Sequence, residues 1–405
     1  MSDATVQPRP SRWQDQLDAI AAGALSEATL NELIAALLSH LATAERTAYL
    51  RQADADKANG FYERRLEAGS LPLSVHVPRT RSGTFRPSVL PPPYQRGFPD
   101  EKRNLILSLI VGARSLEAVR QTLRRLGLTV PDAELDQIVD DLDSELTLIN
   151  SRPVPTDLLA IYYDGKYIEI RDKDRLRPFT IYTVVGILRN GKKRVLASQT
   201  IPGRESLEGW KKILKSLLER GLRRLLIAIH DDLPGLLALS QGLFPKADIQ
   251  LCFVHMQRNA KRHLSKNLNR SFQLRLKSIR NSWDPETAAN DFEQLCTDFQ
   301  ADAPTFIRAI RKKRIHYLAF LNYPDSVRAT FSTTNAVEIV NRQIESARMT
   351  SGGYFQSQRL AHAKLAITIQ NLEAKRWKKP ATNIANALDE LNLIFETRFE
   401  TENTP

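Results

Sequence analysis

Cysteine is nearly absent from this chain, because Cys252 and Cys296 are the two thiols among 405 residues. Two cysteines exclude a disulfide framework and any zinc site built from four cysteines. Long apolar runs are also missing, since no stretch approaches the roughly 20 residues that a membrane helix requires. The first residues carry no apolar signal core, which predicts a cytoplasmic protein with no membrane partner.

The chain is also short of acidic charge. It has 58 Lys and Arg against 46 Asp and Glu, a formal net charge of +12. This excess favours a polyanionic partner, because each phosphate that a protein neutralises releases condensed counterions. Net charge informs on solubility and non-specific binding rather than on a site, so a basic surface without such a partner is the alternative.

Acidic residues are missing altogether from one stretch. Between Cys252 and Trp283 the chain has eight Lys or Arg and no Asp or Glu. A solvated helix face usually mixes both signs, so a run of one sign predicts a surface that faces DNA phosphates. The candidate contacts are Arg258, Lys261, Arg262, Lys266, Arg270, Arg275 and Lys277.

The N-terminal part is predicted to be mainly helical. Apolar residues recur at three- and four-residue spacings over residues 1–58, which predicts a helical region. Residues 59–100 are rich in Arg, Pro and Gly, a composition that favours an extended arm or a small β element. Residues 101–150 return to helical spacing with a break near Gly112. That pattern is typical of a helix-turn-helix, although many helical bundles share it.

The next part of the chain predicts an α/β fold. Residues 158–171, 178–190 and 193–201 are rich in β-branched and aromatic residues, as strands are. Asn190-Gly191 predicts a type I′ hairpin turn between the second and the third. A helix, an apolar strand, another helix and another strand follow. Three antiparallel strands, then helix, strand, helix, strand, is the order of an RNase H-like fold, and other α/β folds share parts of it.

This order predicts how the rest of the chain divides. We expect residues 155–256 to form the first part of the core and residues 257–330 to form a basic helical insertion. Residues 331–395 would supply the closing helices, and residues 396–405 a polar tail that frays.

Two acidic positions follow the strand pattern. Asp164 interrupts a strand-like run although Asp is disfavoured in strands, and a turn at Asp164-Gly165 is the alternative. Asp231 and Asp232 end the apolar run LLIAIH, at the carboxyl end of a strand, where open α/β sheets place their ligands. The alternative is an N-cap for the helix that begins near Pro234, a role that suits Asp232.

A third acidic residue lies in a helical pattern. Glu338 follows Asn335 at capping-box spacing, which is a structural explanation for both. Against it, Asn335, Glu338 and Arg342 recur at three- and four-residue spacing and form a polar stripe on one face. Cys252 and His255 make at most half of a tetrahedral zinc site, so a buried Cys with a polar neighbour is the favoured interpretation.

These segments together resemble the insertion-sequence transposases of the Mutator type, a DDE class with an RNase H-like core. YYDG resembles the strand of the first catalytic aspartate, ESLEGWKKIL the helix with a tryptophan, here Trp210, and IAIHDDLPGL the second-aspartate motif. QLCFVHMQRN resembles the Cys-x-x-His signature, and FSTTNAVEIVNRQIE the closing motif. The segment that ends at Tyr94-Gln95-Arg96 resembles the N-terminal arm of the family.

The resemblance implies a DNA transposase that binds the terminal inverted repeats of a mobile element and performs metal-dependent strand cleavage and strand transfer. It places the catalytic carboxylates on Asp164, Asp231 and Glu338, separated by 67 and 107 residues. These would hold two Mg²⁺ ions, for which Mn²⁺ substitutes, about 3.5–4 Å apart. The residues expected to surround and orient these ligands are Cys252, His255, Asn335 and Asp232.

The resemblance also implies the partners. These are double-stranded DNA, as element ends and as target, and at least a second copy of the chain, since two ends must be joined. The protein would act in the prokaryotic cytoplasm on nucleoid DNA. Outside the insertion, the expected DNA contacts are Arg79, Arg81, Arg96 and Arg342.

Two features depart from the family pattern. Asp232 stands where glycine is usual and competes with Asp231 for the metal. The third N-terminal helix, over residues 131–146, is acidic and a poor reader of DNA, so we expect it to serve dimerisation. Two other functions remain open: a catalytically silent DNA-binding protein on the same fold, and an RNase H-like nuclease.

Overall fold

The computed structural model describes residues 27–52, 56–68, 71–91, 99–128, 130–282 and 284–399. The chain divides into two compact units, the first comprising residues 1–110 and 117–132, the second residues 111–116 and 133–405. The predicted DNA contact Arg96 lies outside the described residues. Among the described residues, no helix has the length and apolar character needed to cross a membrane.

The first unit contains a helix packed on a β-hairpin. β1 (Ala58–Ala68) pairs with β2 (Leu71–Thr80) in antiparallel register, and α2 (Glu27–Gln52) covers the hairpin. The segment predicted as an arm or a small β element therefore forms a β element, because alternate residues of β2 point toward α2 and are buried. The core of this unit includes Ala35, Ala42, Leu66, Leu73, Val75, Val77 and Leu90.

Two helices follow at the break predicted near Gly112. α3 (Pro99–Gly112) ends there, and α4 (Leu116–Arg125) begins four residues later. α5 (Asp132–Ser151) completes the predicted set of three helices.

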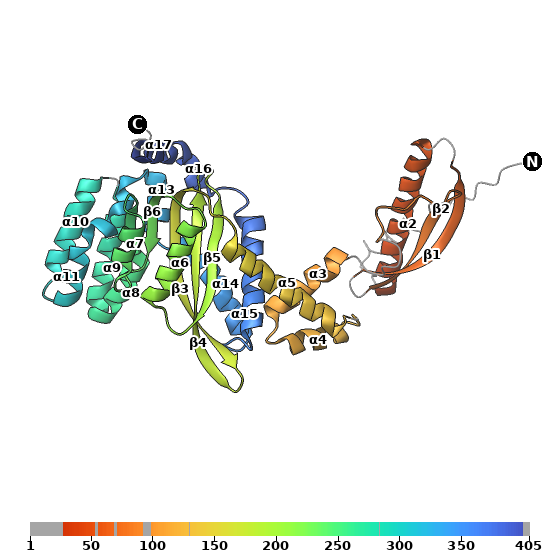
Figure 1. Ribbon diagram of the computed structural model, residues 1–405, viewed down its shortest axis with the longest axis horizontal. Coiled ribbons are helices and arrows are strands. Elements are labelled where there is room, and N and C mark those ends of the chain that lie inside the picture. The colour runs from red at the N-terminus through yellow and green to blue at the C-terminus, as the bar shows by residue number, and fades with distance from the viewer. Residues whose placement is uncertain are drawn as a thin grey trace, which may run out of the picture. The chain divides into compact units, whose positions relative to one another are not determined.

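The second unit is built on one mixed sheet. Its strands are β3 (Asp157–Asp172), β4 (Arg175–Leu188), β5 (Lys193–Pro202), β6 (Arg224–His230) and β7 (Asp248–Leu251). They lie in the order β5-β4-β3-β6-β7 (Figure 1). β3 pairs with β4 and β4 pairs with β5 in antiparallel register, whereas β6 and β7 run parallel to β3. This is the predicted order of three antiparallel strands followed by two helix–strand steps.

The turn between β4 and β5 differs from the prediction. Gly191 has a positive φ of 78°, but Asn190 does not, and a type I′ turn needs both. Gly191 N donates to Leu188 O at 2.8 Å, and Leu188 N donates to Lys192 O at 2.9 Å. The loop is therefore one residue longer than predicted, with a type I turn closed by a left-handed glycine.

Helices cover both faces of the sheet. α6 (Leu207–Glu219) and α7 (Leu236–Leu243) bury Trp210, Ile213 and Leu236 against one face. α14 (Asn335–Thr350) and α15 (Gln358–Asn371) contact β3 from the other. Successive strand residues point to opposite faces, so Tyr163 contacts Trp210 while Asp164 contacts α14.

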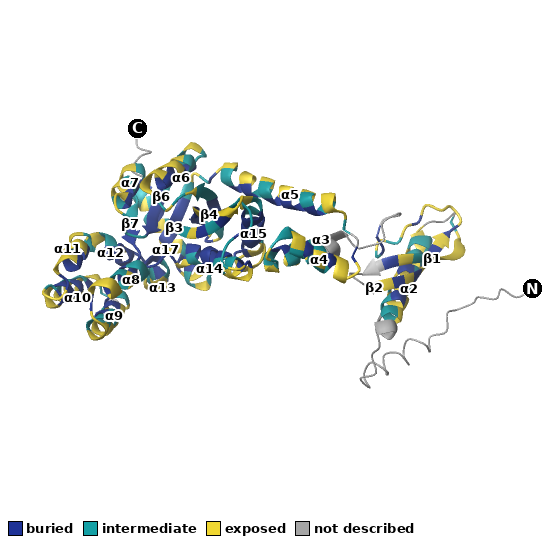
Figure 2. Cartoon of the chain, turned by 90° about the horizontal axis from the view of Figure 1, so that it is seen from below, coloured by how far each residue is buried: buried dark blue, intermediate teal, exposed yellow. Residues whose placement is uncertain are grey.

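The predicted insertion consists of helices between β7 and α14. They are α8 (Phe253–His263), α9 (Lys266–Arg280), α10 (Pro285–Asp298), α11 (Pro304–Lys312), α12 (Arg314–Tyr317), η1 (Ala319–Asn322) and α13 (Asp325–Phe331). Figure 2 shows them with exposed outer faces and buried inner ones, whereas the central strands are buried. After α15 the chain continues through η2 (Leu372–Arg376), α16 (Thr382–Asn386) and α17 (Leu388–Phe399).

The acidic face of α5 pairs within the chain. Arg359 of α15 donates to the Asp136 and Asp140 carboxylates at 3.0 and 2.8 Å. His362 Nδ1 lies 2.6 Å from the Asp143 carboxylate. The dimerisation role expected for this helix therefore loses its basis, because its carboxylates meet the basic side chains of α15.

Candidate active site

Asp231 directly follows β6, and Asp164 lies beside it in the interior of the neighbouring strand β3. β3 and β6 are parallel, and their register pairs Tyr162 with Ile229, so two residues further on Asp164 is level with Asp231. The residues just before them, Tyr163 and His230, have stacked rings with their centres 4.8 Å apart. Asp164 is in the interior of β3 opposite Thr183 of β4, which rules out the alternative of an Asp-Gly turn.

The third carboxylate comes from α14. This helix begins at Asn335, its N-cap is Thr334, and no side chain bonds the cap, so the capping-box explanation of Glu338 is wrong. Asn335 is exposed and does not orient the aspartates as expected. The amide that does is Asn341, two turns further along, whose Nδ2 donates to Asp164 Oδ2 at 2.8 Å.

The Cys-x-x-His pair joins α8 to the site. Cys252 is buried, and its Sγ lies 3.3 Å from both Thr334 Oγ1 and Thr334 N, at the start of α14. One turn later, His255 Nε2 lies 4.0 Å from Asp164 Oδ1. Cys252 thus fixes the position of the glutamate helix, while His255 faces the first aspartate.

Arg258 connects the same helix to Glu338. Its guanidinium lies 3.2 Å from Glu338 Oε1 and 3.1 Å from His255 Nε2. A guanidinium only donates, so Nε2 accepts and the imidazole proton is on Nδ1. Burial, with a smaller contribution from the Arg258 charge, lowers the pKa of His255 to about 4. His255 is therefore neutral at neutral pH.

The two aspartates carry strongly perturbed pKa values. Burial, with the Glu205 and Glu338 charges, raises the pKa of Asp164 to about 7, against an opposing contribution from the Asn341 hydrogen bond. Burial, with Glu205, Asp164 and Asp232, raises the pKa of Asp231 to about 7 as well. The site therefore gathers more negative charge than the protein itself compensates.

Glu205, in the loop before α6, is a residue that sequence reasoning missed. It is the largest charged contributor to both raised aspartate pKa values, and Trp210 Nε1 donates to its Oε1 at 2.7 Å. It lies inside the segment ESLEGWKKIL, but nothing in its spacing from Asp164 or Asp231 indicates contact. Asn341 was missed for the same reason.

Asp232 has a different environment from Asp231. Lys313 Nζ donates to both of its oxygens at 2.5 and 2.7 Å, and Tyr317 OH donates to Oδ2 at 3.3 Å. It is not a helix cap, because α7 begins at Leu236 with Gly235 as N-cap. The carboxylate of Asp232 attaches the α11–α12 region to the core, which leaves Asp231 as the aspartate level with Asp164.

The predicted basic surface is mostly open to solvent. Lys261, Arg262, Lys266, Arg270 and Lys277 on α8 and α9, together with Arg342 on α14, are exposed. Two predicted DNA contacts are instead engaged within the chain, since Arg258 binds Glu338 and Arg275 pairs with Asp298.

Two of the predicted DNA contacts, Arg79 and Arg81, lie in the first unit. The guanidinium of Arg79 lies 4.6 Å from the ring centre of Tyr62. Arg81 is exposed just after β2. An exposed arginine stacked on an aromatic ring remains free to donate to a phosphate, because stacking leaves the edge of the guanidinium open.

The donor chemistry of the site fits a hard divalent cation. Mg²⁺ prefers carboxylate oxygens, and a cation would offset the burial and the carboxylate repulsion that raise both aspartate pKa values. In the residues that the structure describes, no three His, Cys, Asp or Glu side chains converge closely enough to hold one ion. Arg258 binds the Glu338 carboxylate in this arrangement, so Glu338 must leave it to become a ligand.

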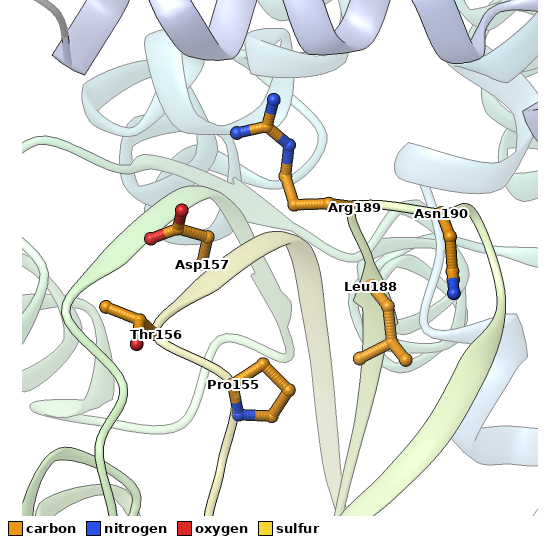
Figure 3. Close-up of a pocket in the computed structure, with 6 residues that line it drawn as sticks. All are labelled: Pro155, Thr156, Asp157, Leu188, Arg189 and Asn190. Atoms are coloured by element: carbon orange, nitrogen blue, oxygen red, sulfur yellow. The ribbon is translucent and has the colours of Figure 1, made fainter.

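The opposite end of the same strands has no such chemistry. A shallow hollow there is lined by Pro155, Thr156, Asp157, Leu188, Arg189 and Asn190 (Figure 3). Arg224 donates to the two oxygens of Asp157 at 2.8 and 2.6 Å, and Arg189 reaches toward α17, where its guanidinium lies 4.0 Å from the ring centre of Phe395. These side chains anchor α17 and satisfy one another.

Comparison with known proteins decides the family. The sequence profile described as "Transposase, Mutator family" matches residues 7–380, nearly the whole chain. The chain belongs to the Mutator family of transposases. The resemblance drawn from the motifs is thereby confirmed.

Curated relatives match along most of their length. The transposase for insertion sequence element ISRM3 of Rhizobium meliloti (strain 1021) is 28% identical over 93% of this chain and 92% of its own. The transposase for insertion sequence element IS256 in transposon Tn4001 of Staphylococcus aureus is 24% identical over 82% and 86%.

A solved structure also matches, the Drosophila P element transposase strand transfer complex. It is 12% identical, with 73% of this chain and 81% of that chain covered and a TM-score of 0.29. A likeness at that TM-score carries no argument about this site.

Proposed function

We propose that this chain is an active DDE transposase, which binds the terminal inverted repeats of a mobile element and cuts and joins DNA with Asp164, Asp231 and Glu338. One observation carries the proposal. Two aspartates from parallel neighbouring strands lie level with each other, and each has its pKa raised to about 7 by burial and surrounding carboxylates. Carboxylates whose pKa values are raised this far by burial and neighbouring charges are expected at a functional site.

The fold and the surface support the same proposal. The sheet order β5-β4-β3-β6-β7, with the first three strands antiparallel and the last two parallel, agrees with an RNase H-like core. The exposed basic residues of α8 lie on the same helix as His255, and those of α9 lie on the next helix. A DNA strand held there by its phosphates would be led toward the carboxylates.

Asp164, Asp231 and Glu338 would hold Mg²⁺ or Mn²⁺ in this proposal. When bound, the ions supply an activated water or 3′ hydroxyl and a stabilised leaving oxygen. The chain itself orients the first aspartate through Asn341 Nδ2. Neutral His255 adds no positive charge beside Asp164, and Arg258 neutralises Glu338 until that carboxylate becomes a ligand. Joining two element ends requires two active sites, so we include at least a homodimer.

The test is end-specific DNA cleavage. Purified protein is incubated with Mg²⁺ and DNA that carries the inverted repeats flanking the gene, and nicks and joints are mapped to the nucleotide. Wild type should cut at the element ends, and the Asp164→Asn and Glu338→Gln variants should not. Glu208→Gln, at a side chain that is 83% exposed, is the matched control and should cut like wild type.

The same assay separates the other functions. Specific binding of the repeats without any cleavage by wild type would identify a silent DNA-binding protein. Cleavage of RNA–DNA hybrid or branched substrates without preference for the repeats would identify a nuclease. Either result contradicts the proposal.

A further inference from the structure

Glu205 is held in place by the first turn of α6. Its neighbour Ser206 is the N-cap of that helix, and Ser206 Oγ accepts from Gly209 N at 3.1 Å. Ser206 N in turn donates to Tyr182 OH at 2.9 Å. Trp210 Nε1 donates to Glu205 Oε1 at 2.7 Å, and the Trp210 ring packs against Tyr163 and Tyr182. The carboxylate therefore has a defined position set by the core.

β3 lacks a side chain where this carboxylate lies against it. A Cβ added to Gly165 would lie 2.5 Å from Glu205 Cδ and 2.7 and 2.8 Å from its two oxygens. Gly165 directly follows Asp164 on the strand. Its absence of a side chain is thus what allows the Glu205 carboxylate to lie beside the backbone of the first catalytic strand.

The charge of Glu205 is not neutralised within the described part of the chain. Its hydrogen-bond donor is the uncharged indole of Trp210, and burial raises its pKa. Asp157, on the same strand as Asp164, is paired with an arginine instead. A half-buried carboxylate that lies near two others, without an arginine or lysine of its own, has the environment of a cation ligand.

We propose that Glu205 is a fourth carboxylate of the active site and joins Asp164 and Asp231 in binding a divalent cation. The three side chains do not converge on one point in the structure, so they must close around the ion when it binds. The choice of cation rests on the proposed function. Trp210 and Gly165 are positioning residues in this arrangement, because the first holds the carboxylate and the second leaves space for it.

The experiment measures cation binding directly, by electron paramagnetic resonance of Mn²⁺ titrated into the full chain. Glu205→Gln keeps an acceptor for Trp210 but removes the charge. It should weaken Mn²⁺ binding at least about tenfold or lower the number of bound ions, as loss of a ligand does. Glu208→Gln removes the same charge three residues away, at a side chain that is 83% exposed, and should bind Mn²⁺ like wild type.

A second variant tests the position of the carboxylate rather than its charge. Gly165→Ala retains every acidic residue, and the atoms nearest to its new Cβ belong to Glu205. It should weaken Mn²⁺ binding in the wild-type background and change it little further in Glu205→Ala, where the obstructed carboxylate is already missing. Circular dichroism and thermal unfolding confirm that each variant is folded.

Each outcome decides the proposal. The proposal is overturned if Glu205→Gln binds Mn²⁺ with the affinity and stoichiometry of wild type. It is also overturned if the Asp164→Asn substitution does not weaken the Mn²⁺ binding seen in wild type. If Mn²⁺ binding depends on Glu205 but wild type never cuts element ends, this inference stands. In that case only the transposase proposal is contradicted.

Discussion

The two ends of β6, each with the part of β3 beside it, treat the same kind of residue in opposite ways. At the beginning of β3, Asp157 receives two hydrogen bonds from Arg224 of β6. At the other end, Asp164 and Asp231 lie level with each other and close to Glu205, and the pKa of each is about 7. The first end uses charge to stabilise the fold, because Asp157 and Arg224 neutralise each other. The second accumulates negative charge, which under the proposed function a bound cation neutralises.

The largest effect should follow from removing charge at the unpaired end. Asp164→Asn or Asp231→Asn should lower the rate of end cleavage by at least about a hundredfold, since cation-assisted chemistry contributes several kcal/mol. The same variants should unfold at an equal or higher temperature than wild type without divalent ions, because buried like charges repel one another. A large loss of stability in either variant would contradict the comparison.

The pH dependence of stability should be the next largest difference. Both aspartates have folded pKa values of about 7 against the ordinary 3.8, so the folded state binds their protons more tightly. Stability from these groups is therefore fully present below about pH 4 and is lost as pH rises toward 7. In metal-free denaturant titrations from pH 5 to 8, Asp164→Asn/Asp231→Asn should lose this fall in stability.

Wild type is compared with that double variant because the histidines act in the opposite direction. Burial lowers the pKa values of His230 and His255 to about 4, so their contribution is lost as pH falls below 6.5. Both proteins contain these histidines, so their contribution cancels when the stability of one protein is subtracted from that of the other at each pH. An identical pH slope in both proteins would show that the aspartates do not titrate as described.

At the paired end, a substitution should affect stability alone. Asp157→Asn weakens the paired hydrogen bonds that Arg224 donates to this carboxylate and should lower the free energy of unfolding by about 1–2 kcal/mol. Cleavage per folded molecule should be unchanged. The measurement is urea denaturation alongside the cleavage assay at a temperature where both proteins are folded.

The smallest effect is expected at Asp232, although it is adjacent to Asp231. Asp232→Asn breaks the contact with Lys313 and should cost about 1 kcal/mol or less, since both side chains are partly solvated. Cleavage should remain close to that of wild type. Loss of cleavage as complete as in Asp231→Asn would mean that Asp232 takes part in the chemistry.

The sequence was sufficient to predict the elements and their order. Strands β3 to β5 follow from β-branched and aromatic residues, and Asp164 was conspicuous because a strand interior disfavours it. Local sequence patterns gave a wrong or no prediction where a contact with a distant part of the chain determines the role of a residue. Asp232 looks like a helix cap until Lys313, 81 residues away, takes its carboxylate. Glu205 and Asn341 gain their significance from neighbours on other elements, and no spacing rule connects them to Asp164.

The placement of Glu338 on α14 has a consequence for the time at which the protein becomes able to act. Ribosomes release the sheet first, so a growing chain carries Asp164 and Asp231 well before Glu338 emerges. The glutamate is then fixed only when Thr334 reaches Cys252 and Asn341 reaches Asp164. Domains fold as units during synthesis, so under the proposed function the chain becomes able to break DNA only after α14 has joined the sheet.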